Sequence, residues 1–117
     1  MHHHYQPTAH FARKLSHLKK VDTDGYRRIQ KTISRLLLHP EDADGRMVGL
    51  YDGRLKKYVG RGDFRIIYYW CRLCHRENQR QHCLIPDNSV IFFDIYHKKD
   101  KKRIKKNSTQ KGDYATF

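Results

Sequence analysis

The sequence predicts an α+β fold. An N-terminal hairpin of two helices is expected to pack on one face of a small, mainly antiparallel sheet of three to four strands, followed by a basic C-terminal tail. Apolar residues recur with the period of a helix as far as His39 and with the period of a strand after Gly53. The length of 117 residues allows one modest core, so we expect a single domain.

The first helix is expected from Thr8 to Lys20. Its apolar stripe follows the spacing i, i+4, i+7 and consists of Phe11, Leu15 and Leu18. Thr8 is the expected N-cap, because its hydroxyl can accept a hydrogen bond from an unpaired amide of the first turn.

A second helix is expected after the segment Asp22–Gly25, which breaks the first helix and can cap the next. The pair His39-Pro40 ends it, since the residue before a proline disfavours helical geometry. Its apolar stripe consists of Tyr26, Ile29, Ile33, Leu36 and Leu37. The two helices, joined by a tight turn, form an antiparallel hairpin with one apolar side.

Three strands follow from the alternation of apolar and polar residues. They are expected at Leu55–Val59, Phe64–Cys71 and Ser89–His97, with Gly60–Asp63 as the first turn. A short strand around His4–Gln6 would make a fourth.

The two faces of the strand Phe64–Cys71 differ in character. One face carries Phe64, Ile66, Tyr68 and Trp70, and the other carries Arg65, Ile67, Tyr69 and Cys71. Two helices cover only one face of a sheet. We therefore expect the face with Arg65 to be the less buried one.

Composition points to a polyanionic or acidic partner. Lys and Arg number 25 against 12 Asp and Glu, a formal net charge of +13. No apolar run is long enough to cross a membrane, and no apolar signal-peptide segment is present, so a cytoplasmic location without membrane contact is expected. The three cysteines lack the pattern of a disulfide framework.

The boundaries of the expected domain follow from the charge pattern. Residues 1–105 form the domain, and residues 106–117 form a flexible basic tail. Residues 1–4, which include three consecutive histidines, look like the remnant of a tag. A frayed helix is expected directly after His97.

The chain resembles the RelE/ParE superfamily, the toxins of type II toxin–antitoxin systems. The resemblance covers roughly Tyr5 to Lys105. Its most specific part is the segment GDFRIIY, Gly62–Tyr68, which matches the pattern G-D-[FY]-R-[IV]-[IV]-Y in full. The RelE branch implies a ribosome-dependent endoribonuclease that cleaves messenger RNA without a metal or cofactor, and this branch is favoured. The ParE branch implies an inhibitor of DNA gyrase.

The resemblance also implies a set of catalytic residues. Arg65 matches the arginine that binds the scissile phosphate, and Lys56 matches the first of two basic residues on the preceding strand. Tyr58 takes the place of the second, which Lys57 could replace. His97 is a candidate acid or base and Lys98 a candidate phosphate ligand. Further candidate RNA-binding residues are Arg54, Lys57, Tyr58, Arg61, Lys99, Lys101 and Lys102.

One departure from the family leaves the general base open. The tyrosine that the family carries a few residues after the last strand is absent, and Lys102 and Lys105 stand in that region. Two other functions therefore stay open: a ParE-like gyrase inhibitor that acts by binding, and a degenerate toxin that retains only the antitoxin interface. The expected partners are an acidic antitoxin, messenger RNA and the ribosome.

The connection before the last strand is unusually long and contains all three cysteines. Cys71, Cys74, His82 and Cys83 could supply the four ligands of one tetrahedral zinc if this hairpin bends. The alternative is a plain extension of the strands with reduced cysteines. A Cys74–Cys83 disulfide disagrees with a reducing cytoplasm.

Overall fold

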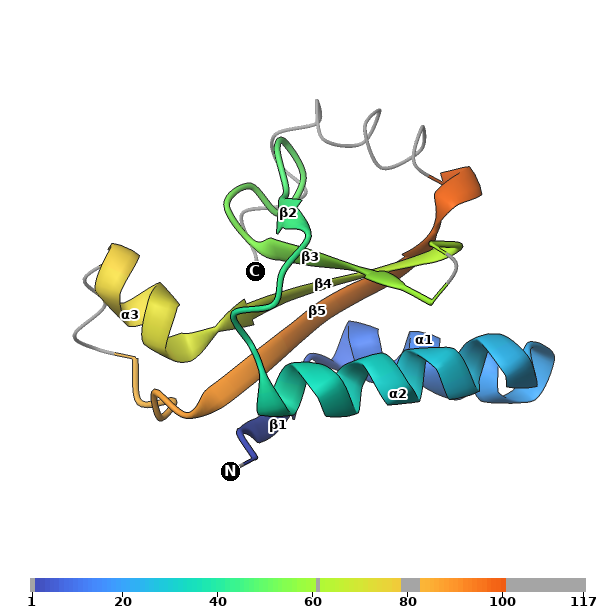
Figure 1. The fold of residues 1–117 in the computed structure, drawn as a ribbon, viewed down its shortest axis with the longest axis horizontal. Coiled ribbons are helices and arrows are strands. Elements are labelled where there is room, and N and C mark those ends of the chain that lie inside the picture. Colours follow the sequence, from blue (N-terminus) through green and yellow to red (C-terminus); the bar gives the residue numbers. More distant parts are fainter. Residues whose placement is uncertain (1, 61, 79–82, 101–117) are drawn as a thin grey trace.

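Two capped helices form the N-terminal half of the protein. The computed structural model describes residues 2–60, 62–78 and 83–100 (Figure 1). Helix α1 spans Ala9–Val21, and the Thr8 hydroxyl accepts from Phe11 N at 3.1 Å, which confirms the predicted N-cap. Helix α2 spans Thr23–Leu38. Asp22 is both the C-cap of α1 and the N-cap of α2, so the break between the helices is one residue long.

The sheet has five strands, in the order β1-β5-β4-β3-β2. Their bounds are β1 His4–Pro7, β2 Gly45–Arg46, β3 Leu55–Val59, β4 Phe64–Trp70 and β5 Ser89–His97. Pairs β2–β3, β3–β4 and β4–β5 are antiparallel, but β1 pairs with β5 in parallel. The prediction of three to four mainly antiparallel strands was therefore wrong in number and in part in direction. The two unforeseen pairings involve the short strands β1 and β2, which are too short to leave a periodic signal in the sequence.

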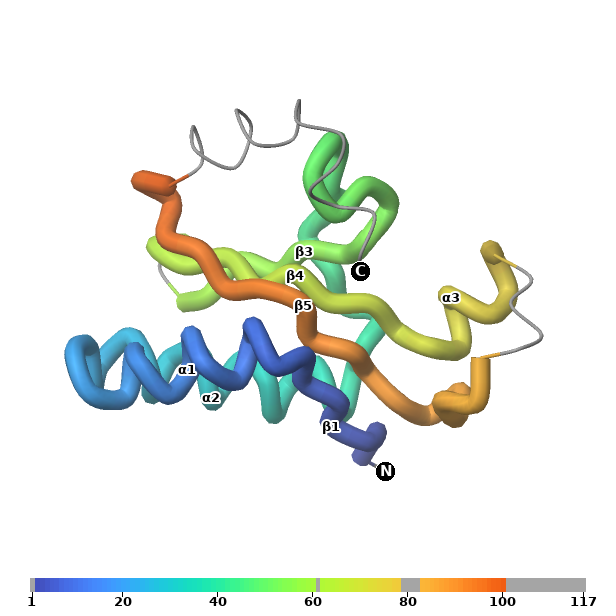
Figure 2. Tube along the Cα trace, turned by 180° about the vertical axis from the view of Figure 1, so that it is seen from behind, coloured from blue at the N-terminus to red at the C-terminus, as the bar shows by residue number. Residues whose placement is uncertain are grey.

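The main core lies between the helices and the sheet. Figure 1 shows α1 and α2 side by side on the same face, and Figure 2, from behind, shows α1 running along β5. The side chains at the centre of this layer are fully buried: Phe11, Ile29, Leu36, Ile66, Tyr68, Phe92. Removing such a side chain costs about 2–5 kcal/mol, so this layer supplies much of the folding energy.

The second face of the sheet, which was expected to be the less buried one, is closed over much of its area. Ile67 and Tyr69 on this face are 0% and 5% exposed. The loop between β2 and β3 folds over it (Figure 1) and contributes Met47, Leu50 and Tyr51 to the core. The end of the sheet near Arg65 is more open, and Arg65 itself is half-buried.

A β-bulge in β5 lies next to a buried carboxylate that accepts hydrogen bonds from several elements. Ile67 pairs with Asp94 and Tyr68 with Phe92, so Phe93 is the extra residue in β5. Asp94 is 4% exposed, and its carboxylate accepts from Lys14 Nζ at 2.7 Å, from the Tyr51 hydroxyl at 3.0 Å and from the Ile95 amide at 2.8 Å. One carboxylate thus connects α1, β5 and the β2–β3 loop.

The connection before β5 is helical at its start. Helix α3 spans Cys71–Asn78, where a strand extension had been predicted, and β4 ends at Trp70. The described residues after β5 form a 3-10 turn, η1 Lys98–Asp100. The rest of the expected frayed helix and the tail 106–117 lie outside the described residues. Within the part of the chain that the structure describes, no helix is long and apolar enough to cross a membrane.

Candidate nucleic-acid interface

Three neighbouring strands bring basic and aromatic side chains together at the open end of the sheet. Tyr58 of β3 pairs with Arg65 of β4, and Arg65 pairs with Tyr96 of β5. Directly paired residues point to the same side of a sheet. The Arg65 guanidinium lies 4.4 Å from the centroid of the Tyr58 ring, and Lys56 Nζ lies 5.8 Å from it. We call this set, Lys56, Tyr58, Arg65 and Tyr96, the Arg65 face.

The β3–β4 turn orients Arg65. The guanidinium donates from Nη1 to the Gly62 carbonyl, and the Gly62 amide donates to the Val59 carbonyl at 2.7 Å. Gly62 has φ +85, a conformation that favours glycine. The glycine of the GDFRIIY segment thus shapes the turn that holds the arginine over Tyr58.

The position of Lys56 depends on its neighbour in β2. Lys56 pairs with Gly45, and a Cβ built at Gly45 would lie 2.9 Å from Lys56 Cε. The missing side chain therefore lets the lysine stem pass across β2. Because Tyr58 is 42% exposed, its ring is open to a ligand beside two cations.

Tyr96 is the residue of this face that sequence reasoning missed. Burial raises the pKa of its hydroxyl, and the nearby Arg65 charge lowers it by a smaller amount. The phenol is therefore protonated at neutral pH and can act as a hydrogen-bond donor. The available signal was the alternation along β5, because Tyr96 points opposite to His97.

His97 lies on the other face of the sheet. It pairs with Phe64, and the two rings meet edge to face with centroids 5.1 Å apart. Its Nδ1 accepts from the Lys99 amide at 3.1 Å. The structure therefore does not bring His97 together with Arg65 and Lys56. Lys98 lies nearby at η1, where its Nζ is 3.7 Å from Asp63 Oδ1.

The remaining predicted RNA-binding residues that the structure describes lie in different environments, and they do not form one surface with Arg65. Arg54 lies over the rings of Tyr69 and Phe93, at 5.8 and 5.3 Å, on the covered part of the Arg65 side. Lys57 points away from Lys56, forms ion pairs with Asp42 and Asp44 at 3.4 Å, and is only 15% exposed. Lys99 is exposed on η1. Arg61, Lys101 and Lys102 lie outside the described residues.

The cysteine-rich connection does not form the expected hairpin. Cys71 and Cys74 lie on α3, and none of the three cysteines forms a disulfide. No group of three His, Cys, Asp or Glu side chains suited to a metal occurs in the described ranges, and His82 lies outside them. The helix replaces the cross-strand arrangement on which the zinc hypothesis depended.

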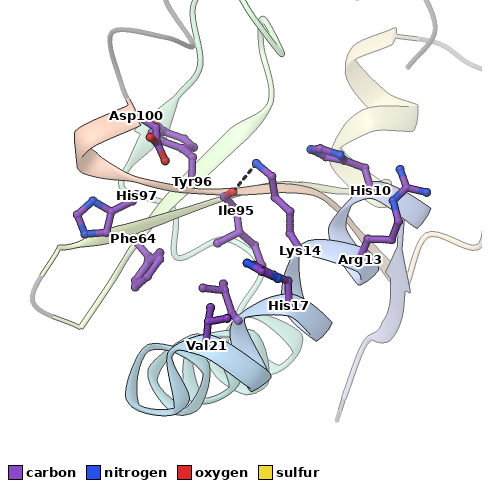
Figure 3. A pocket seen from close by; sticks show the side chains of 11 residues that line it. His10, Arg13, Lys14, His17, Val21, Phe64, Ile95, Tyr96, His97 and Asp100 are labelled. Atoms are coloured by element: carbon purple, nitrogen blue, oxygen red, sulfur yellow. Dashed lines mark hydrogen bonds between the residues drawn. The ribbon is translucent and has the colours of Figure 1, made fainter.

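A groove lies along the edge of β5, on the helix side of the sheet (Figure 3). Its volume is about 450 Å³. Four basic residues of α1 line it at the spacing i, i+3, i+4, i+7, namely His10, Arg13, Lys14 and His17. The other lining residues are Leu18, Val21, Phe64, Ile95, Tyr96, His97 and Asp100. We call this feature the α1 groove; the basic spacing on α1 was its overlooked sequence signal.

The two surfaces have different chemistry. The Arg65 face combines an exposed ring with a planar guanidinium and an ammonium, which suits stacking of a base and binding of a phosphate. The α1 groove combines basic groups with an apolar wall. The chain matches no protein-family model, no curated protein and no solved structure.

Proposed function

We propose that the protein is the toxin of a type II toxin–antitoxin pair, a RelE-like, ribosome-dependent endoribonuclease that cleaves messenger RNA without a metal. The observation that supports this most directly is the Arg65 face, where Arg65 and Lys56 flank the exposed ring of Tyr58 at 4.4 and 5.8 Å. Single-stranded RNA is bound by such combinations of aromatic rings and cations, because bases stack on the rings while phosphates pair with the charges.

Each residue of the face has a role in this proposal. Tyr58 stacks on a base, and the Arg65 guanidinium binds two oxygens of the scissile phosphate. The 2′-hydroxyl gives its proton to water as its oxygen attacks the phosphorus, and the bond to the 5′-oxygen breaks as that oxygen takes up a proton from water. Lys56 offsets the negative charge that develops on the phosphorane, and the protonated Tyr96 hydroxyl donates to an oxygen of the reacting group.

The test is induced expression in growing cells. We expect protein synthesis to stop before DNA or RNA synthesis, with new 5′ ends inside translated messages, because the nuclease acts on messages engaged by ribosomes. The measurement is pulse labelling of the three polymers together with mapping of RNA ends. DNA breaks with intact messages would instead indicate the gyrase inhibitor.

The position of His97 favours a second candidate function. Its ring packs on Phe64, on the face opposite Arg65, so the imidazole cannot take the proton from a 2′-hydroxyl bound at Arg65. A toxin that binds its target without cleaving it, including the ParE-like and degenerate forms, needs no such base. Purified protein incubated with programmed ribosomes separates the two functions: bound but uncut message supports the binding-only toxin.

We propose that the partner is an acidic antitoxin that binds in the α1 groove through an amphipathic helix. The basic residues of α1 supply charge complementarity, and Val21 and Phe64 supply apolar contact (Figure 3). Leu18 adds to the apolar wall. Added strand pairing is disfavoured at Ile95, because its carbonyl accepts from Lys14 Nζ at 2.8 Å and its amide donates to Asp94. A helix leaves both bonds intact.

The variant Arg13→Glu tests this placement. It is expected to weaken binding of the purified acidic protein encoded beside this gene by about tenfold, a cost of about 1.4 kcal/mol, because it reverses an exposed charge in the groove. Isothermal titration provides the measurement. The matched control is Arg35→Glu on α2, whose side chain is 68% exposed and pairs with Asp42 away from the groove. Equal losses in both variants would show that only net charge matters.

A further inference from the structure

The turn between β3 and β4 contains an aspartate that is bonded to two other elements. Asp63 Oδ2 accepts from Arg28 Nη1 of α2 at 3.3 Å, and Asp63 Oδ1 lies 3.7 Å from Lys98 Nζ of η1. The Asp63 carbonyl also accepts from the Lys98 amide at 2.8 Å. The turn and η1 lie at the same end of the sheet (Figure 1). The turn is therefore attached both to the helical hairpin and to the segment that follows β5.

The position of Arg28 is fixed by its other contacts. Its Nε donates to Asp24 Oδ2, one turn earlier in α2, at 3.2 Å, and its guanidinium lies 5.9 Å from the centroid of the Phe64 ring. A Cβ built at Gly60 would lie 3.3 Å from Arg28 Cδ, so the glycine leaves room for the arginine stem. The side chains of Arg28 and Asp63 are 23% and 31% exposed. Salt and water therefore screen their ion pair less than a fully exposed one.

Asp63 stands between the two residues that determine where Arg65 lies. Gly62, directly before it, accepts from the Arg65 guanidinium through its carbonyl. Phe64, directly after it, is buried against α2, where a Cβ built at Gly25 would lie 2.9 Å from its ring. A movement of the turn would therefore displace both the acceptor of the guanidinium and the backbone that carries it.

We propose that Asp63 is a positioning residue, which holds the β3–β4 turn so that the Arg65 guanidinium stays over the Tyr58 ring. A carboxylate repels phosphate, so Asp63 acts through Arg65 and not by binding RNA. Without the carboxylate, the two cations lose their shared acceptor and the turn is free to move relative to α2. Misplacement of a catalytic group by about 1 Å can lower a rate by roughly 100-fold. The consequence for cleavage rests on the proposed function, whereas the position of Arg65 does not.

The first measurement follows the Arg65 guanidinium in the full-length protein without RNA. Its Nε–H signal in the nitrogen-15 NMR spectrum is identified by its loss in Arg65→Ala. Asp63→Asn retains the size of the side chain and removes its charge. We expect the Arg65 signal to shift and its heteronuclear NOE to fall in this variant. The matched control is Asp24→Asn, which removes the other partner of Arg28, is 79% exposed, and should leave the Arg65 signal unchanged.

The second measurement is cleavage of message on purified ribosomes. Asp63→Asn should lower kcat by about tenfold, because the guanidinium occupies its productive position for less of the time. KM should change by less than about twofold, since the rest of the message and the ribosome supply most of the ground-state binding. Combining Asp63→Asn with Arg28→Gln should cost little more than Asp63→Asn alone, because both substitutions remove the same ion pair.

An unchanged Arg65 signal in Asp63→Asn, or an equal change in Asp24→Asn, would overturn the proposal. An unchanged kcat of Asp63→Asn beside an active wild-type protein would do the same. Circular dichroism verifies the fold of each variant, and Arg28→Gln, for which the same change in the Arg65 signal is expected, provides the decision if Asp63→Asn unfolds. If the wild-type protein cleaves no message, the proposed function fails, and the NMR comparison still decides this inference.

Discussion

Arg65→Ala is expected to abolish growth arrest and to weaken transition-state stabilisation by about 2–4 kcal/mol, roughly 30- to 1000-fold in cleavage rate. The guanidinium is the one planar fork on the Arg65 face, and it lies 4.4 Å from the ring that would stack a base. Arg65→Lys keeps the charge but loses the fork, so it should recover only part of the activity. The measurement is cleavage of message on purified ribosomes, with RNA affinity determined in parallel.

The fold should survive this substitution. Arg65 donates a hydrogen bond to the Gly62 carbonyl at a turn, and the substitution removes this bond. The free energy of unfolding should therefore fall by about 0.5–1.5 kcal/mol. Antitoxin binding should be largely retained, because Arg65 is not among the residues that line the α1 groove. The matched control is Lys57→Ala, whose amine pairs with Asp42 and Asp44 instead of facing Tyr58. Undiminished toxicity of Arg65→Ala would exclude the phosphate-binding role.

The second large effect is expected for stability, at Asp94. Asp94→Ala should lower the free energy of unfolding by about 2–4 kcal/mol, because it removes one acceptor from several donors at once. The Tyr51 hydroxyl is 3.0 Å from the carboxylate and is buried, and the ammonium of Lys14 is 2.7 Å from it. Tyr51 has φ 59, a strained conformation for a tyrosine, and its bond to Asp94 helps to hold it.

Denaturant unfolding measures this loss. Asp94→Asn retains acceptor capacity without the charge, so its loss should be smaller than that of Asp94→Ala. The exposed Asp52→Ala serves as the control and should change stability by less than about 0.5 kcal/mol. If Asp94→Ala matches that control, the carboxylate does not connect α1 to the β2–β3 loop. Because the loop covers the second face of the sheet, Asp94→Ala should also increase proteolysis between Met47 and Arg54.

The local elements could be predicted because their causes are local. Thr8 caps the helix that follows it, and Asp22 accepts from the Gly25 amide three residues later at 2.9 Å. Strand β3 and the start of β4 follow from alternation on either side of the glycine turn. Lys56, Tyr58 and Arg65 lie on adjacent antiparallel strands that are joined by a short turn. Such a turn restricts the register of the two strands, so this grouping could in principle be inferred from the sequence.

Elements that depend on distant pairing could not be predicted in this way. A short strand around His4–Gln6 was expected and is present as β1, but its parallel pairing with β5 joins residues more than eighty positions apart and was not foreseen. Helix α3 lies where a strand was expected, and the Arg72 amide in its first turn donates to the carbonyl of the distant Asp87. Closure of the second face by the β2–β3 loop depends on Tyr51 reaching Asp94, a contact across 43 positions.

The sequence by itself determined the helical hairpin, the three longer strands and the basic charge. Only the tertiary structure decided which face each candidate residue occupies. Phe64 pairs with His97, so Arg65 necessarily pairs with Tyr96, and a tyrosine rather than a histidine lies next to the arginine. The physical reason is that side chains alternate along a strand, whereas the register between strands is set by packing and hydrogen bonds that no local pattern contains.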